Sequence, residues 1–453
     1  MPTIAFATLG CRVNQYDTDS MRGLFLAEGF TEADFNDIAD VYVINTCSVT
    51  QVGEKKSRQL MRRAKKRNPS CLVIVTGCYA QLQPELIAAM DSVDAVVGTD
   101  EKKHIVAVVR RLLDDRQAGR ESAVKEAVVA VHNIMGHDDF EDIPLYPSAV
   151  EHTRADLKIQ EGCNNFCTYC IIPYTRGGLK SRQPDSVIAE AQRLSAAGFK
   201  EIVLTGIHLG AYGRELPARP TLALILRRLL AETDIQRIRM GSVESLEVDD
   251  ELIAVMNSSE RICPHLHLPI QSGADAILKA MHRHYTKGEF VALIEELRRR
   301  IHGLTISTDL ILGFPGETEA LFAETMETLE RLRFSHIHAF PYSPRRGTPA
   351  ATMKDQVDTS VKKRRVELVN ALSARQKDEL LTSMVGQTVQ VLLETQTGRE
   401  GEGFSEQYER VHVEQLASPS QGCIVPVVLE GVHDHILFGS IKEETHNGRL
   451  PVL

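Results

Sequence analysis

Three cysteines within eight residues restrict the fold of this chain more than any other feature of its sequence. Cys163, Cys167 and Cys170 form a C-x3-C-x2-C loop that follows a predicted strand at 156–161 and Gly162. Short loops of this sort present cysteine thiolates to iron–sulfur clusters. We call these residues the loop cysteines and expect them to hold a 4Fe–4S cluster. Because three ligands leave one of the four irons open, we expect this cluster to bind a substrate, which a fully ligated cluster cannot do.

A structural zinc site is the main alternative for the loop cysteines. Structural zinc takes four ligands, usually in paired C-x2–4-C units. The loop has no second pair nearby in the sequence, and the candidate ligand His152 precedes the strand instead of following it. The spacing therefore favours an iron–sulfur cluster over zinc.

Three further cysteines each lie just after a predicted strand. Cys11, Cys47 and Cys78, which we call the strand-end cysteines, follow their apolar runs within two residues. In an open parallel sheet, ligands bind outside the carboxyl ends of the strands. We therefore expect these three side chains to converge on a second 4Fe–4S cluster, again with one iron open. The alternative is three separate buried cysteines that act as small hydrophobic residues.

The other cysteines carry no such signal. The chain has nine cysteines with uneven spacing, and an odd count argues against a disulfide framework. We expect Cys71, Cys263 and Cys423 to be ordinary core or surface residues. The net charge is −9, and no apolar run approaches the roughly 20 residues that span a bilayer. The first residues lack the pattern of a signal peptide, so we expect a cytoplasmic protein without a membrane partner.

Alternating strand and helix patterns predict an α/β fold in three parts, because 453 residues exceed one ordinary hydrophobic core. Residues 1–115 predict an open parallel α/β domain, and residues 116–155 a linker with one strand at 127–132. Residues 156–383 predict a partial barrel of six βα units, since a full barrel needs about 250 residues. Residues 384–448 have short β-type runs broken by glycines and predict a small β-barrel.

The remaining element boundaries follow from hydrophobic periodicity. Strands are predicted at 3–9, 41–45, 72–76, 95–98, 200–206, 236–242, 264–270, 304–312, 335–341, 388–393, 408–413, 424–429 and 436–438. Helices are predicted at 15–28, 51–67, 83–90, 100–113, 184–197, 221–231, 249–257, 274–281, 286–300, 317–332 and 359–383.

The loop cysteines are part of a longer pattern. With Phe166 and Tyr169 they read C-x3-C-x-aromatic-C, which resembles the signature of the radical S-adenosylmethionine superfamily. Together with the strand-end cysteines and the β-rich tail, almost the whole chain resembles the methylthiotransferases of that superfamily, whose tail is a TRAM domain. The resemblance implies two 4Fe–4S clusters, with S-adenosylmethionine as radical source and methyl donor. It also implies an enzyme that inserts sulfur into a C–H bond and methylates it.

Several short stretches are similar to one branch of this family. Residues 9–17 (LGCRVNQYD), 45–50 (NTCSVT), 55–59 (KKSRQ), 402–404 and 408–411 resemble the enzymes that modify threonylcarbamoyladenosine at tRNA position 37. The expected reaction is sulfur insertion at C-2 of the adenine, followed by or coupled to methyl transfer. The alternatives are methylthiolation of isopentenyladenosine in tRNA or of a ribosomal protein residue, and a non-catalytic, cluster-bearing protein that binds RNA.

Other family motifs end predicted barrel strands, at 204–206, 241–244, 267–273 and 309–318. Barrel active sites form at the carboxyl ends of strands. From the resemblance we expect the S-adenosylmethionine pocket to be lined by Tyr169, Thr205, Ser242, Glu244 and Gln271.

A basic stretch follows Cys47. Eight of the fourteen residues at 54–67 are Lys or Arg, and such residues supply phosphate contacts. The alternative is a solvated helix face. We expect a grip on the anticodon stem–loop of tRNA by Lys55, Lys56, Arg58, Arg62 and Arg63. Residues 362–365 (KKRR) are a second candidate.

The tail does not share this basic character. Residues 384–453 hold four Lys or Arg against ten Asp or Glu, and this acidic balance leaves the role of the tail in RNA binding open. The expected reaction needs two further partners: an electron donor such as flavodoxin or ferredoxin, and a source of sulfur.

Overall fold

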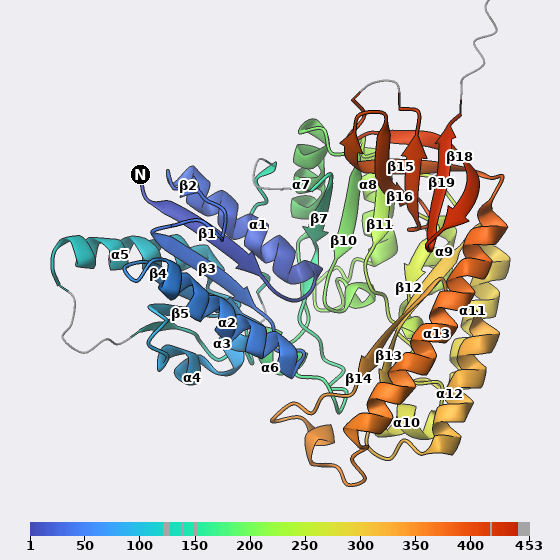
Figure 1. The fold of residues 1–453 in the computed structure, drawn as a ribbon, viewed down its shortest axis with the longest axis horizontal. Helices are drawn as coiled ribbons and strands as arrows, with labels where there is room; N and C mark the ends of the chain where they lie inside the picture. Colours follow the sequence, from blue (N-terminus) through green and yellow to red (C-terminus); the bar gives the residue numbers. More distant parts are fainter. Residues whose placement is uncertain (121–126, 138, 148–151, 417–418, 443–453) are drawn as a thin grey trace, which may run out of the picture.

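The computed structural model describes residues 1–120, 127–137, 139–147, 152–416 and 419–442. Within these ranges the chain forms an N-terminal α/β sheet, a central half-barrel and a small closed β-barrel (Figure 1). The N-terminal sheet lies at one side of the half-barrel (Figure 1). The closed barrel packs against the amino-terminal ends of the first half-barrel strands. The predicted α/β fold class is confirmed.

The N-terminal sheet is parallel throughout and has the strand order β2-β1-β3-β4-β5-β6. Its two central strands, β3 and β4, are buried along their whole length, as expected where helices cover both faces. The strands are β1 (Thr3–Thr8), β2 (Thr31–Glu32), β3 (Val41–Thr46), β4 (Leu72–Gly77), β5 (Ala95–Val97) and β6 (Val128–Ala130). The helices are α1 (Arg12–Ala27), α2 (Gln51–Arg67), α3 (Cys78–Leu82), α4 (Pro84–Ala88), the 3-10 turn η1 (Lys102–His104) and α5 (Ile105–Gln117).

Two details of this sheet differ from the expected boundaries. The strand expected within the linker, β6, pairs with β5 and so belongs to the N-terminal sheet. Helix α3 begins at Cys78 itself, although five residues with no clear apolar period gave no helix signal in the sequence. Helix α2 matches its predicted bounds, because the Thr50 side chain accepts a hydrogen bond from the Gly53 amide at 3.1 Å and caps the first turn.

The half-barrel consists of two three-stranded parallel sheets, β7-β10-β11 and β12-β13-β14. Isolated bridges such as Ser242–His267 connect β11 to β12. The strands are β7 (Arg154–Lys158), β10 (Glu201–Thr205), β11 (Arg237–Met240), β12 (His265–His267), β13 (Thr305–Leu312) and β14 (His336–Pro341). The short strands β8 (Gln160–Glu161) and β9 (Lys180–Ser181) form a separate antiparallel pair. The outer helices are α7 (Pro184–Ala196), α8 (Leu222–Glu232), α9 (Asp250–Met256), α10 (Asp275–Ala280), α11 (Lys287–Arg300) and α12 (Glu319–Leu332). A short helix, α6 (Ile172–Arg176), and the 3-10 turns η3 (Leu209–Ala211), η4 (Ser245–Glu247) and η5 (Pro349–Thr352) complete this part.

The long helix α13 (Thr359–Met384) runs along the half-barrel to the closed barrel (Figure 1). Its last residues, including Leu381 and Met384, belong to the core of that barrel. The barrel has the strand order β15-β16-β17-β19-β18. Its strands are β15 (Thr388–Thr397), β16 (Glu400–Ser405), β17 (Arg410–Glu414), β18 (Ile424–His433) and β19 (Ile436–Ile441). The end of the predicted tail domain, 443–448, lies outside the described residues.

Strand β16 was not predicted, because its sequence EGEGFS lacks the apolar alternation of a strand. Its glycines have a packing reason instead. A Cβ at Gly403 would lie 1.9 Å from the Leu392 carbonyl oxygen, and one at Gly401 would lie 2.8 Å from the Thr395 oxygen. Glycine therefore allows β16 to lie closely against β15. In the described part of the chain, no helix combines the length and apolarity that a membrane crossing requires.

Candidate active site

The strand-end cysteines lie at the carboxyl ends of three neighbouring strands. Strand β3 lies between β1 and β4 in the sheet, and Cys11, Cys47 and Cys78 follow these three strands. The Leu9 amide donates to the Asn45 carbonyl at 2.9 Å, so the segment before Cys11 stays beside the segment before Cys47. A Cβ built on Gly10 would lie only 3.2 Å from Cys47 Cβ. The parallel register therefore brings the three thiols to one edge of the sheet.

Burial of Cys11 and Cys47 raises the pKa of both thiols and favours their protonated form in the absence of a metal. Burial raises the pKa of Cys47 to about 11, and the neighbouring thiols of Cys78 and Cys11 add to the increase. Each thiolate would place a negative charge near the other two in a partly dehydrated site. A bound metal or cluster removes this cost, because it takes all three sulfurs as deprotonated ligands.

The loop cysteines follow the β8 strand through a tight turn at Gly162. This glycine has φ +71°, and a Cβ there would lie 1.7 Å from the Gly178 carbonyl oxygen. The Cys163 amide donates to the Gly177 carbonyl at 3.1 Å, and the Cys170 amide donates to the Cys167 carbonyl at 2.9 Å. Backbone hydrogen bonds thus hold the loop in a compact shape that turns its sulfurs to one side.

Two charged side chains contact the sulfurs of the loop. His208 Nδ1 lies 3.6 Å from Cys163 Sγ, and its Nε2 lies 2.6 Å from Glu247. Burial opposes a charge on this imidazole, but the contacts with Cys163 and Glu247 outweigh it and raise the pKa of His208 to about 10. Arg283 donates to Cys167 Sγ at 3.5 Å. Burial raises the pKa of Cys170 to about 12 and also raises the pKa of Cys167, so these two thiols favour the neutral form until a metal binds.

One cavity of about 780 Å³ connects the two sets of cysteines. Cys11 lines it together with all three loop cysteines, whereas Cys47 and Cys78 are not among its lining residues. The five residues expected to bind S-adenosylmethionine also line this cavity: Tyr169, Thr205, Ser242, Glu244 and Gln271. Four of them lie at or just beyond the carboxyl ends of β10, β11 and β12, where a barrel binds its ligands.

Local contacts hold three of these five residues in place. The Glu244 carboxylate forms an ion pair with Arg283, the same guanidinium that contacts Cys167. Gln271 has the left-handed φ of 61°, and its amide donates to the Asp309 carbonyl at 2.9 Å. Ser242 is held by its bridge to His267 between the two half-barrel sheets. The loop cysteines and the pocket residues therefore form one connected site.

The turn between β16 and β17 forms another wall of the cavity. Phe404, Tyr408 and Glu409 line it. The Tyr408 ring lies 4.4 Å from the Arg239 guanidinium and 5.1 Å from the His265 ring, and its hydroxyl accepts a hydrogen bond from Arg12. The acidic C-terminal barrel thus reaches the cavity through an aromatic turn. Basic residues of the half-barrel and Arg12 of α1 hold this turn in place.

Histidines of β12 and β14 complete the lining. His267, Asp309 and His338 each offer a ligand atom within 4.8 Å of the others, the one such group of three in the described residues. Burial lowers the pKa of His338, and burial lowers that of His336 to about 4. Both imidazoles are therefore neutral near pH 7 and offer hydrogen bonds and ring faces to a ligand.

The basic helix α2 starts four residues after Cys47. Lys55, Lys56, Arg62 and Arg63 are exposed on it. Arg58 is half-buried and donates to the Tyr79 hydroxyl at 2.9 Å. In the second basic run, Lys362 and Arg365 are buried, and Arg365 pairs with Glu317 at 2.7 Å. Half of that run therefore has a structural role.

The sequence did not identify the polar residues that contact the cysteine sulfurs. These are Arg176, His208 and Arg283, which lie 98, 45 and 116 positions from the cysteines they contact. Only the position of Arg176, six residues after Cys170 and directly before two glycines, offered a local signal. The roles of His208 and Arg283 depend on contacts between distant elements.

Two family models match the chain. The N-terminal sheet matches the model described as uncharacterized protein family UPF0004 over residues 3–98, and the half-barrel matches the radical SAM superfamily over residues 157–329. A threonylcarbamoyladenosine tRNA methylthiotransferase of Bacillus subtilis is 44% identical over 91% of this chain and 90% of its own length. The chain belongs to the radical S-adenosylmethionine methylthiotransferase family.

Other methylthiotransferases are similar over comparable lengths. A threonylcarbamoyladenosine enzyme of Aquifex aeolicus is 39% identical over 86% of this chain and 92% of its own. A tRNA-2-methylthio-N(6)-dimethylallyladenosine synthase of Pelotomaculum thermopropionicum is 34% identical over 96% and 97%. Among solved structures, the radical S-adenosylmethionine methyltransferase TsrM of Kitasatospora setae has a TM-score of 0.56 at 15% identity and covers 77% of each chain. This last likeness concerns the fold alone.

Proposed function

We propose that this protein is a tRNA methylthiotransferase that converts threonylcarbamoyladenosine at position 37 to its 2-methylthio derivative. The observation that carries the proposal is the single cavity lined by Cys11 and by all three loop cysteines. The identity of 44% and 39% to enzymes named for this nucleoside supports the choice of substrate. The proposed reaction needs both cysteine sites to reach one bound nucleoside.

The donor sets fit two iron–sulfur clusters with three protein ligands each. The thiols of each set influence one another electrostatically. Cys71 cannot add a fourth ligand to the strand-end set, because it precedes β4, at the opposite end of that strand from Cys78. We therefore assign one cluster to Cys11, Cys47 and Cys78, and the other to Cys163, Cys167 and Cys170. With S-adenosylmethionine, the second cluster would supply a carbon radical and a methyl group, and the first would supply sulfur.

The chain's own residues have three tasks in this proposal. Tyr169, Thr205, Ser242, Glu244 and Gln271 bind and orient S-adenosylmethionine. Arg283 holds the Glu244 carboxylate beside Cys167 through its ion pair. The Tyr408 turn and the histidines of β12 and β14 close the cavity around the nucleoside and limit the entry of water. An electron donor such as flavodoxin or ferredoxin, and a sulfur source, complete the partners that this reaction needs.

The proposed RNA surface is the exposed side of α2, with Lys55, Lys56, Arg62 and Arg63 as phosphate contacts. Each lost phosphate contact reduces the salt dependence of binding by roughly 0.7–0.9 in the log–log slope. Replacing Lys55, Lys56 and Arg62 with alanine should lower that slope by about 2. The matched control replaces Arg299 and Arg331, exposed cations on α11 and α12 at the far end of the molecule (Figure 1), and should leave the slope unchanged. Equal slopes for both variants would exclude α2 as the RNA surface.

Mass spectrometry of tRNA nucleosides tests the proposed reaction. A strain that lacks the gene should lose 2-methylthio-threonylcarbamoyladenosine and accumulate the unmodified threonylcarbamoyl nucleoside. Complementation with the intact gene should restore it. An unchanged amount of the methylthio nucleoside in the deletion strain would contradict the proposal.

A second candidate substrate is the dimethylallyladenosine of tRNA. Its support is the 34% identity to a synthase for that nucleoside over nearly the full length of both chains. The same measurement separates the two, because loss of 2-methylthio-dimethylallyladenosine alone would identify this substrate. The higher identity to the threonylcarbamoyladenosine enzymes favours the first.

A further inference from the structure

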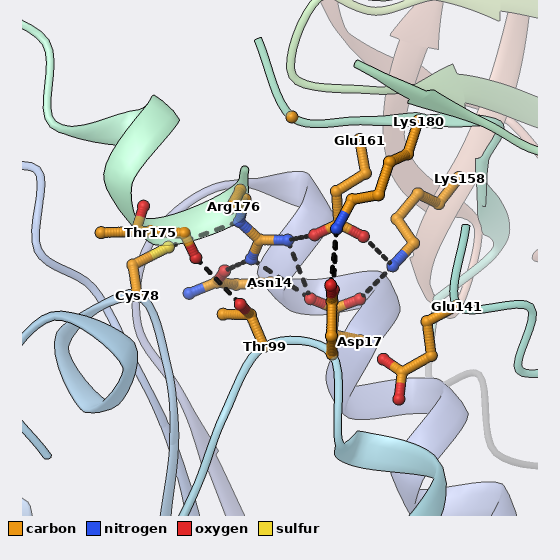
Figure 2. A network of polar contacts seen from close by, with 12 residues as sticks. Asn14, Asp17, Cys78, Thr99, Glu141, Lys158, Glu161, Thr175, Arg176 and Lys180 are labelled. Atoms are coloured by element: carbon orange, nitrogen blue, oxygen red, sulfur yellow. Dashed lines mark hydrogen bonds and ion pairs between the residues drawn. The ribbon is translucent and has the colours of Figure 1, made fainter. Parts of the chain in front are cut away.

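A buried network of charged residues joins the N-terminal sheet to the half-barrel (Figure 2). Lys158 of β7 lies 2.6 Å from Asp17 of α1 and 2.9 Å from Glu161 of β8. Arg176 at the end of α6 pairs with both of these carboxylates. Lys102 with Glu141 and Lys180 with Asp100 extend the network. The loop cysteines lie on the segment between β8 and α6, so this network lies directly beside them.

The charges of this network balance. The four cations are Lys102, Lys158, Arg176 and Lys180, and the four anions are Asp17, Asp100, Glu141 and Glu161. Charges removed from water are costly unless each has a partner, and here every one does. Loss of one cation would leave an uncompensated negative charge inside the contact between the two parts.

Arg176 differs from the other three cations because it also contacts a cysteine. Its Nε donates to Cys78 Sγ at 3.4 Å. Its two terminal nitrogens donate to the side chains of Asn14, Asp17 and Glu161. The guanidinium fork is fully used, with partners on α1, α3 and β8 (Figure 2), and a planar fork of this kind fixes the relative orientation of its partners.

Through Asn14, the influence of Arg176 extends to the other two strand-end cysteines. The Asn14 side-chain amide donates to the Leu9 carbonyl at 2.6 Å and to the Thr46 carbonyl at 3.0 Å. Thr46 immediately precedes Cys47, and Leu9 lies two residues before Cys11. Arg176 is therefore linked to all three strand-end cysteines, directly at Cys78 and through Asn14 at the segments before the other two.

We propose that Arg176 is a positioning residue which orients the strand-end cysteines toward the loop cysteines and sets the reduction potential of the cluster that they hold. This inference rests on the proposed function, because it assumes a cluster at Cys11, Cys47 and Cys78. Hydrogen bonds to the sulfurs and nearby charge tune the potentials of such clusters. A cation beside Cys78 stabilises the more negative, reduced state and thus raises the potential. Through Arg176 at the end of α6, the half-barrel thus contributes to the electronic environment of the cluster at the strand-end cysteines.

The potential can be measured on a full-length chain in which the three loop cysteines are alanine, so that only the strand-end cysteines bind iron. After anaerobic reconstitution, a redox titration followed by electron paramagnetic resonance gives the midpoint. Arg176→Gln should shift it to more negative values by at least 59 mV, a tenfold change in the ratio of oxidised to reduced protein for one electron. Lys180→Gln is the matched control, because it removes a buried cation of the same network that contacts no cysteine in the described residues. It should shift the midpoint less.

Glu161→Gln provides a test of opposite sign. It removes a negative charge beside Arg176 and should shift the midpoint to more positive values. This variant therefore tests the inference even if Arg176→Gln does not fold. An unchanged midpoint in Glu161→Gln, or equal shifts in Arg176→Gln and Lys180→Gln, would overturn the inference. A parent chain that binds no iron at the strand-end cysteines would instead contradict the proposed function, and the inference with it.

Discussion

Replacement of Tyr408 by alanine should loosen the turn through which the C-terminal barrel reaches the cavity. The ring lies 4.4 Å from the Arg239 guanidinium and 5.3 Å from that of Arg154. Each cation–π contact of this kind contributes about 0.5–1 kcal/mol. The hydroxyl also accepts a hydrogen bond from Arg12, and a bond to a charged group contributes about 1.5–3 kcal/mol. Because the Arg12 side chain is 37% exposed, the lower end of that range applies, and we expect a total loss of about 3 kcal/mol.

Hydrogen exchange of the amides at 400–414 measures this loss as a local opening. A loss of about 3 kcal/mol should increase their opening roughly 100-fold, while the amides of the N-terminal sheet stay protected. The backbone supplies an internal control, since Tyr408 has φ 69° and an L-residue in this region carries a strain of roughly 1–2 kcal/mol. Tyr408→Gly removes the same contacts but relieves that strain, so it should open less than Tyr408→Ala. Unchanged exchange at 400–414 in Tyr408→Ala would refute the inference that Tyr408 holds this turn in place.

Three other variants test the site and its support. Gly162→Ala places a Cβ 1.7 Å from a carbonyl oxygen and should abolish iron binding by the loop cysteines, whereas Gly198→Ala, with φ +98° and open space around it, should keep the full iron content. Cys11→Ala should still cleave S-adenosylmethionine to 5′-deoxyadenosine in an anaerobic assay but form no methylthio nucleoside; retained thiolation would contradict the role of Cys11. Burial opposes the charge of Glu201, but Arg239 and Arg237 outweigh it and lower the pKa of Glu201, so its stabilising effect is present above its ordinary pKa and is lost as the pH falls through the lowered value. Glu201→Gln should therefore cost about 3–5 kcal/mol in urea unfolding at pH 7, and its difference from the parent should shrink on acidification; a constant difference would contradict this pH linkage.

Much of the fold was predictable because its signals are local. The bounds of α2 were predicted from its helical periodicity, and in the structure a Thr50 cap fixes its first turn. Strands β3 and β4 were predicted from continuous apolar runs. Strand β16 was not predicted because its glycines serve close packing against the backbone of β15 and show no apolar alternation of their own. Gly401 and Gly403 pack against Thr395 and Leu392, which lie 6 and 11 residues earlier in the sequence. The start of α3 at Cys78 escaped because five residues carry too little periodicity to indicate a helix.

The candidate site divides in the same way. The spacing of the loop cysteines and the placement of the strand-end cysteines after predicted strands were both readable, because a short loop and a strand end are properties of contiguous sequence. The side chains that contact these sulfurs could not be predicted from the sequence. His208 and Arg283 reach the loop from other barrel units, and Arg58, expected to face RNA, donates to Tyr79. Which long side chain meets which sulfur or hydroxyl depends on packing between distant elements.

By itself, the sequence predicted which cysteines would hold clusters and determined the order of the α/β and β-rich parts, because ligand spacing and backbone periodicity are properties of consecutive residues. The tertiary structure decided that Cys11 lines the same cavity as the three loop cysteines, whereas Cys47 and Cys78 do not line it. It also decided that Arg176 uses its whole guanidinium to connect the two halves. These facts depend on how α1 packs against β7 and how α6 meets α3. Such contacts have no local sequence signal, since the packing of two surfaces that are distant in sequence determines which buried charges pair.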